Sequence, residues 1–219
     1  MRSKVHARLQ ILATLALIIP LFSPAKANCV SLYDNLVSQN EGVTIISFDG
    51  PFANSFSTGG DIFNLGEVKL LLNGEPDHID PGSSGLLNVG LYSNNNATPG
   101  GLLYEIGTLD DHSLSSELKV FEFELASAYT LATNTRYWIV VSDDSGAANW
   151  GYSLDQSALG VSGEYHGSFQ YGYAPNTSGP FQMSLSGSSG APVPEPATMI
   201  LFGTGLAGLA AARRRKKAC

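Results

Sequence analysis

Several segments in the middle of the chain alternate between apolar and polar residues. Residues 67–73 place aliphatic side chains between polar ones, residues 87–91 do the same, and residues 120–125 alternate apolar side chains with glutamates. A period of two puts successive side chains on opposite faces of a strand. Each segment is therefore predicted to be a strand with one buried face.

Two further segments favour strands by their composition. Residues 137–141 (Tyr-Trp-Ile-Val-Val) are apolar throughout, which is typical of a central strand covered on both faces. Residues 43–48 are rich in β-branched side chains, and Gly50-Pro51 follows them. Clusters of Gly, Asn, Asp and Ser separate the strands, and the cluster over residues 93–101 predicts a turn.

These patterns predict an all-β fold for residues 28–183, because no part of this range has a sustained helical period. About ten short strands separated by polar turns favour an antiparallel β-sandwich that is jelly-roll-like. A partly open barrel is the alternative. Residues 184–192 are rich in Gly and Ser and are predicted to be a flexible linker.

The first 27 residues have the composition of a secretory signal peptide. Three basic residues precede an apolar core over residues 9–22, and Ala25 and Ala27 form an Ala-x-Ala site for signal peptidase. Cleavage is expected before Asn28. A lipoprotein signal is less favoured, because a small residue should directly precede Cys29 and Asn28 stands there.

The end of the chain combines a proline motif, an apolar segment and a basic cluster. Residues 197–212 carry no charge and predict a transmembrane helix, although its length of ~24 Å is less than the ~30 Å hydrocarbon core. A buried C-terminal helix is the less favoured alternative. The basic cluster should stay in the cytoplasm, which orients the rest of the chain outward. It consists of Arg213, Arg214, Arg215, Lys216 and Lys217.

This ordered combination resembles the PEP-CTERM sorting signal of exopolysaccharide-producing Gram-negative bacteria. The motif residues are Val193, Pro194, Glu195 and Pro196, followed by the apolar segment and the basic end. The resemblance implies export, transient tethering in the inner membrane, and recognition by an exosortase that cleaves near Pro-Glu-Pro. The processed protein would then lie at the cell surface or outside the cell.

The middle of the chain resembles a family of surface domains, the choice-of-anchor R type. This resemblance implies a surface domain, and it carries no activity and no functional residues. The matching positions are residues 32–35, 89–93, 99–100, 131–141 and Trp150.

Setting the two targeting segments aside changes the charge of the chain. The whole sequence has a formal net charge of −7, but residues 28–194 hold eighteen acidic and three basic residues, a net charge of −15. Such a field keeps an extracellular protein soluble and repels nucleic acid, so no nucleic-acid partner is expected. Cys29 and Cys219 are expected on opposite sides of the membrane, so they should not pair.

Motifs of common catalytic sites are absent from the sequence. It contains no Gly-x-Ser-x-Gly, no His-Glu-x-x-His and no cysteine pair at metal-binding spacing. His78, His112 and His166 lie far apart in the chain and are expected to be surface residues. A carboxylate pair of the glycosidase type depends on distances in the fold, so a secreted glycan hydrolase stays an alternative.

Two segments are candidates for binding. Residues 75–82 hold Glu75, Asp77 and Asp80 among turn residues, and such oxygen ligands suit calcium, while Asp110-Asp111 and Asp143-Asp144 are weaker candidates. In the segment from residue 164 to 173, Tyr165, Phe169 and Tyr171 alternate with polar residues. This aromatic stripe could stack against sugars, but the favoured interpretation is the core-facing side of a strand.

Three function classes follow. The leading hypothesis is a non-catalytic exported protein of the cell surface or extracellular matrix. The second is a module that binds exopolysaccharide, and the third is a secreted hydrolase.

Overall fold

The structure, a computed structural model, describes residues 29–47, 50–74, 85–168 and 176–189. These residues form eleven strands and one 3₁₀ turn. No helix among the described residues is long and apolar enough to cross a membrane. The predicted signal peptide and transmembrane segment lie outside these ranges. The elements are β1 (Cys29–Asp34), β2 (Gly42–Ser47), β3 (Phe52–Ser57), β4 (Phe63–Gly74), β5 (Leu86–Asn95), β6 (Thr98–Asp110), η1 (Asp111–Ser113), β7 (Lys119–Leu131), β8 (Arg136–Asp143), β9 (Ala147–Tyr152), β10 (His166–Ser168) and β11 (Met183–Ser189).

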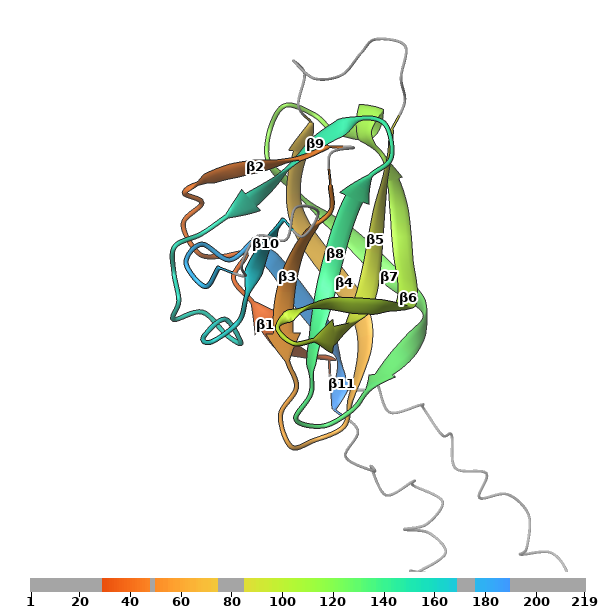
Figure 1. Cartoon of the computed structure of the whole chain (residues 1–219), viewed down its shortest axis with the longest axis vertical. Helices are drawn as coiled ribbons and strands as arrows, with labels where there is room; N and C mark the ends of the chain where they lie inside the picture. Colours follow the sequence, from red (N-terminus) through yellow and green to blue (C-terminus); the bar gives the residue numbers. More distant parts are fainter. Residues whose placement is uncertain (1–28, 48–49, 75–84, 169–175, 190–219) are drawn as a thin grey trace, which may run out of the picture. The chain divides into compact units, whose positions relative to one another are not determined.

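The strands form two antiparallel sheets that pack face to face (Figure 1). Sheet A has the order β1-β11-β4-β9-β2, with β7 also paired to β4. Sheet B has the order β10-β3-β8-β5-β6. This arrangement confirms the predicted all-β antiparallel sandwich.

The core between the sheets is built from the apolar sides of the alternating segments. The side chains predicted to face inward on β4 and β5 are almost completely buried, whereas the polar residues between them face outward. On β7 Phe123 is buried and its neighbours Glu122 and Glu124 are exposed, also as predicted. The buried residues of β4 and β5 are Val68, Leu70, Leu72, Leu87, Val89 and Leu91.

Strand β8 is the central strand that residues 137–141 predict. It lies between β3 and β5, and all five of these residues are buried. Tyr137, Ile139 and Val141 belong to the core between the sheets, whereas Trp138 and Val140 form a second apolar cluster with Ala53. The second cluster lies on the outer face of sheet B, and partly buried Tyr92 and Tyr165 pack against it.

Two predicted boundaries are wrong. Residues 184–189, predicted to be part of a flexible linker, belong to β11, which pairs with β1 and β4 on its two sides. Their small Ser and Gly side chains suit a strand flanked on both edges, and pairing overrides the flexibility that the composition suggests. The turn predicted over residues 93–101 is shorter than expected, because β5 ends at Asn95 and β6 begins at Thr98. Asn96 and Ala97 form the turn with φ values of 49° and 63°.

Candidate functional site

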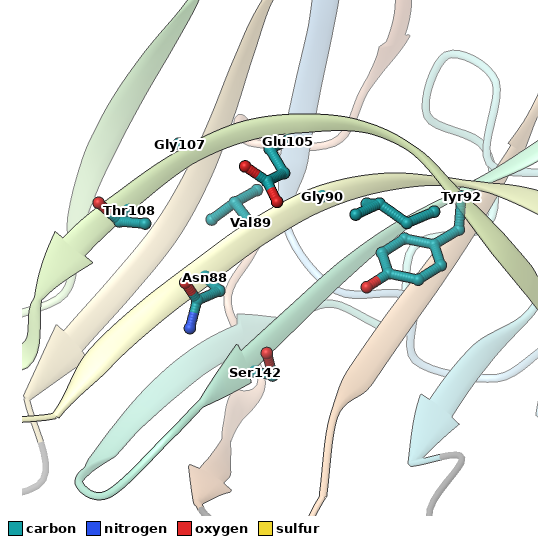
Figure 2. Close-up of a pocket in the computed structure, with 9 residues that line it drawn as sticks. Asn88, Val89, Gly90, Tyr92, Glu105, Gly107, Thr108 and Ser142 are labelled. Atoms are coloured by element: carbon teal, nitrogen blue, oxygen red, sulfur yellow. The ribbon is translucent and has the colours of Figure 1, made fainter.

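The outer face of sheet B contains a hollow with a volume of about 380 Å³, which we call the sheet B hollow. Figure 2 shows Tyr92 at one end, Thr108 at the other, and Glu105 between them on β6. Strands β5, β6 and β8 supply all of its side chains. The lining residues are Asn88, Val89, Gly90, Tyr92, Leu102, Glu105, Gly107, Thr108 and Ser142.

Strand pairing arranges these side chains in rows across the sheet. Asn88 of β5 lies opposite Ser142 of β8 and Thr108 of β6, which makes a row of amide and hydroxyl groups. Four residues further along β5, Tyr92 lies opposite Trp138 and Leu102, which makes an apolar row. Because strands rise about 3.3 Å per residue, the two rows are separated by roughly 13 Å.

Gly90 forms the floor between the rows, opposite Glu105. A β-carbon at Gly90 would lie 2.8 Å from Cε2 of Tyr92 and 3.0 Å from Cδ1 of Leu102, closer than carbon atoms pack. Because Gly90 has no side chain, the Tyr92 ring and the Leu102 side chain can pack directly against the backbone of β5. Register shifts at Val89/Gly90 and Leu91/Tyr92 bend the β5–β6 hairpin at this point.

The tip of this hairpin crosses in front of β8 and β3 (Figure 1). Trp138 is fully buried although it faces away from the core between the sheets, and its Nε1 donates a hydrogen bond of 3.0 Å to Oδ1 of Asn94 on the hairpin. The buried Trp138 thus anchors the apolar end of the sheet B hollow and positions Tyr92.

A charged group borders the same face. Glu164 is buried, and its Oε2 accepts hydrogen bonds from Nε of Arg136 at 3.0 Å and from the hydroxyl of Ser55. The Arg136 guanidinium also lies 4.6 Å from the centre of the Tyr165 ring. Tyr165 is therefore held between a cation and the Trp138 cluster, which fixes its ring.

The aromatic stripe is only partly described. Phe169 and Tyr171 lie outside the described residues, whereas half-buried Tyr165 lies on the outer face of sheet B. The favoured interpretation places the aromatic side chains of this segment in the core. The side chain of Tyr165 instead faces away from the core between the sheets. The next residue, His166, faces the core and packs edge-on against Phe181, with ring centres 5.4 Å apart.

His166 corrects the prediction that the three histidines are surface residues. It pairs with Asn54 in the β3–β10 ladder and is 6% exposed. Burial lowers its pKa to about 4, so the imidazole is neutral at pH 7. His112 is half-exposed as expected, with 40% of its side chain accessible, and His78 lies outside the described residues.

The sheet B hollow combines apolar surface with hydrogen-bonding groups. Tyr92 and Leu102 supply apolar surface, and Asn88, Thr108, Ser142 and Glu105 supply hydrogen-bonding groups. Glu105 is the only charged residue among the described residues that line the hollow. The arrangement therefore suits a neutral polyhydroxylated ligand better than a strongly charged one.

Several further sequence-predicted residues lie outside the described ranges, whereas the weaker calcium candidates Asp110-Asp111 and Asp143-Asp144 lie within them. Those outside are the cleavage residues Ala25 and Ala27, the calcium candidates Glu75, Asp77 and Asp80, the sorting residues 193–196 and the basic residues 213–217. Conversely, the sequence did not point to the hollow. Apart from Val89, its residues on β5 occupy the outward-facing side of the alternating segment 87–91, and only the strand register brings them together with residues of β6 and β8.

Together these features define an antiparallel β-sandwich domain, and the comparison with protein families indicates how the protein is sorted. Residues 192–216 match the PEP-CTERM protein-sorting motif, which confirms the sequence prediction at this end of the chain. The motif implies that the protein is exported, processed by an exosortase and sorted to the cell surface. The match does not extend into the sandwich domain, and no curated protein matches the chain.

Proposed function

We propose that this protein is a non-catalytic component of the extracellular matrix whose sandwich domain binds exopolysaccharide in the sheet B hollow. The observation that carries the proposal is the pairing of an apolar row with a polar row on one solvent-facing sheet. Sugar rings have apolar faces and hydroxyl edges, so they need both kinds of surface at once. The sorting motif supports it, because the resembling signals occur in exopolysaccharide-producing bacteria.

Hydrolysis is less well supported than binding. Glycosidases of the common type use two carboxyl groups about 5–10 Å apart on opposite sides of the scissile bond. Glu105 is the single carboxylate among the described residues lining the hollow, and on the same face of the sheet Glu164 is buried and paired with Arg136. A secreted hydrolase would need a second acid that can reach a sugar beside Glu105.

The strand order supports a jelly-roll topology for this domain. From β6 to β11, consecutive strands alternate between sheet B and sheet A. Such alternation is the arrangement expected of a jelly roll, in which connections cross between two sheets. The resemblance to the choice-of-anchor R surface domain is consistent with a domain displayed for binding.

Replacing Tyr92 with alanine is expected to weaken exopolysaccharide binding about tenfold, because aromatic anchors commonly contribute ~1.4 kcal/mol or more. Leu102→Ala, at a site 48% exposed, should weaken it in the same direction with little effect on folding. Binding is measured by affinity electrophoresis in gels that contain the purified polysaccharide of the producing strain. Val120→Ala, 45% exposed on β7 of the other sheet, is the matched control. Unaltered retardation of both hollow variants would refute the proposed site.

Replacing Pro194, Glu195 and Pro196 together with alanine is expected to leave the protein membrane-retained and unprocessed, because the exosortase would lose its motif. Cell fractionation followed by mass spectrometry of the mature ends measures this. Thr133→Ala, an exposed residue between β7 and β8, should be processed like the parent. Continued release of a tail-less product from the triple variant would contradict the sorting assignment.

A further inference from the structure

Two acidic pairs that are distant in the sequence meet at one end of the sandwich. Asp110 ends β6 and Asp111 begins η1, while Asp143 ends β8 and Asp144 follows it. Figure 1 shows η1 and the end of β8 at the same end of the domain. Asp111 and Asp143 are buried, with 0% and 5% exposure, whereas Asp110 and Asp144 are exposed.

Within the described part of the chain, each buried carboxylate accepts hydrogen bonds through only one of its oxygens. Oδ1 of Asp111 accepts hydrogen bonds from N of Gly85 at 3.1 Å and from Nδ1 of His112 at 2.8 Å. Oδ1 of Asp143 accepts from N of Ser145 at 3.1 Å and from N of Gly146 at 2.7 Å. The Oδ2 atoms of both are buried and have no hydrogen-bond partner within the described part of the chain.

The two carboxylates border the same small space. A β-carbon at Gly85 would lie 2.3 Å from Oδ1 of Asp143 and 2.8 Å from Oδ2 of Asp111. A β-carbon at Gly146 would lie 1.7 Å from Oδ2 of Asp111 and 3.3 Å from Oδ1 of Asp143. Both positions are therefore restricted to glycine by the carboxylates, and Oδ2 of Asp111 lies no more than about 5 Å from Oδ1 of Asp143.

Two ionised carboxylates in this setting repel each other and lack part of their hydration. Burial is the main cause of the raised pKa of Asp143, and the charges of Asp111 and Asp144 act in the same direction. Lys69, Lys119 and Arg136 are the only Lys or Arg residues within the described ranges, and their ion pairs there are with Glu67, Glu117, Glu122 and Glu164. A bound cation would supply the missing positive charge.

We propose that Asp111 and Asp143 bind a calcium ion, with the unpartnered Oδ2 of Asp111 as one of the ligand atoms. Carboxylate oxygens are hard ligands, and calcium accepts the irregular geometry that two aspartates and water can offer, whereas magnesium requires a near-ideal octahedron. The exported domain meets extracellular calcium, for which site dissociation constants of about 10⁻⁴–10⁻³ M are typical. The ion would join the end of β8 to η1 and the start of β5. This proposal does not depend on the proposed sugar site.

The test uses the full chain in detergent, freed of metal by chelation. Calcium at about 10 to 100 times its dissociation constant is expected to raise the melting temperature by roughly 3–10 °C. Asp143→Asn and Asp111→Asn should each abolish this rise. In Asp143→Asn, the amide oxygen can keep the two backbone hydrogen bonds and Nδ2 can donate to Asp111, so the metal-free variant should melt no lower than the parent. Asp61→Asn, an exposed acid between β3 and β4, should keep the full rise.

Calorimetric titration with calcium chloride gives the second readout, and each aspartate variant is expected to lose at least about tenfold in affinity. No calcium-dependent rise in the parent, or a parental rise in both aspartate variants, would overturn the proposal. An equal rise with magnesium chloride would overturn the assignment to calcium.

Discussion

Replacing Trp150 with alanine is expected to lower the free energy of unfolding by about 3–5 kcal/mol, the range for removing a large buried aromatic side chain. Trp150 is fully buried on β9, and its ring stacks on Phe181 with centres 4.6 Å apart. Its Nε1 donates a hydrogen bond of 3.0 Å to the carbonyl oxygen of Gln182. The substitution would leave a cavity between the sheets, and the carbonyl oxygen of Gln182 would keep only its hydrogen bond from N of Leu71.

Urea denaturation followed by near-ultraviolet circular dichroism measures this loss. Trp150→Phe keeps an aromatic ring beside Phe181 and removes the hydrogen bond, so it should cost less, about 1–2 kcal/mol. Leu154→Ala, at a residue 58% exposed, should stay within about 0.5 kcal/mol of the parent. A loss below about 1 kcal/mol for Trp150→Ala would contradict the packing of this core.

Replacing Arg136 with alanine is expected to cost about 3 kcal/mol, because it leaves the carboxylate of Glu164 buried without its cation. The Glu164 side chain is 5% exposed, and that of Arg136 is 28% exposed. Arg136 also donates from Nη2 to the carbonyl oxygen of Gly163 at 3.0 Å, so its loss loosens the segment before β10. The same urea denaturation gives the free energy.

The double variant Arg136→Ala with Glu164→Gln separates these contributions. Removing the unpaired charge should restore more than half of the lost free energy of unfolding, since burying a neutral amide costs less free energy than burying a carboxylate. Lys119→Ala is the control, because Lys119 and Glu117 form an exposed pair at 3.7 Å whose removal should cost less than about 1 kcal/mol. If Arg136→Ala lowered the free energy of unfolding no more than Lys119→Ala does, the ion pair would not stabilise the buried Glu164.

Local sequence pattern predicted much of the sandwich. The alternation over residues 67–73 identified the buried side of β4, because a half-buried strand repeats every two residues. The unbroken apolar run over residues 137–141 identified β8 as central, because both of its faces are covered. Composition failed for β11, whose Ser and Gly residues gain order only from strands β1 and β4.

The arrangement of the candidate sites could not be predicted in the same way, because it depends on register between distant strands, and the sequence indicated Asp111 and Asp143 only as members of two separate acidic pairs. Asn88, Thr108 and Ser142 are unremarkable polar residues until pairing aligns them in one row. Likewise, Asp111 and Asp143 share a space only because β6 and β8 flank β5 and end on the same side of the domain. The prediction of a surface position for His166 is wrong because it rests on polarity alone, whereas pairing with Asn54 turns the side chain of His166 toward the core.

The position of β11 has a mechanical consequence for a protein sorted through its C-terminal end. Tension that reaches the domain through this end enters at Ser189, the last residue of β11. Because β11 lies between β1 and β4, pulling along its axis loads both hydrogen-bond ladders in shear. Bonds loaded in shear share the force, whereas an edge strand peeled from one end loses them one at a time. The strand to which the force is applied is therefore hydrogen-bonded along both of its edges.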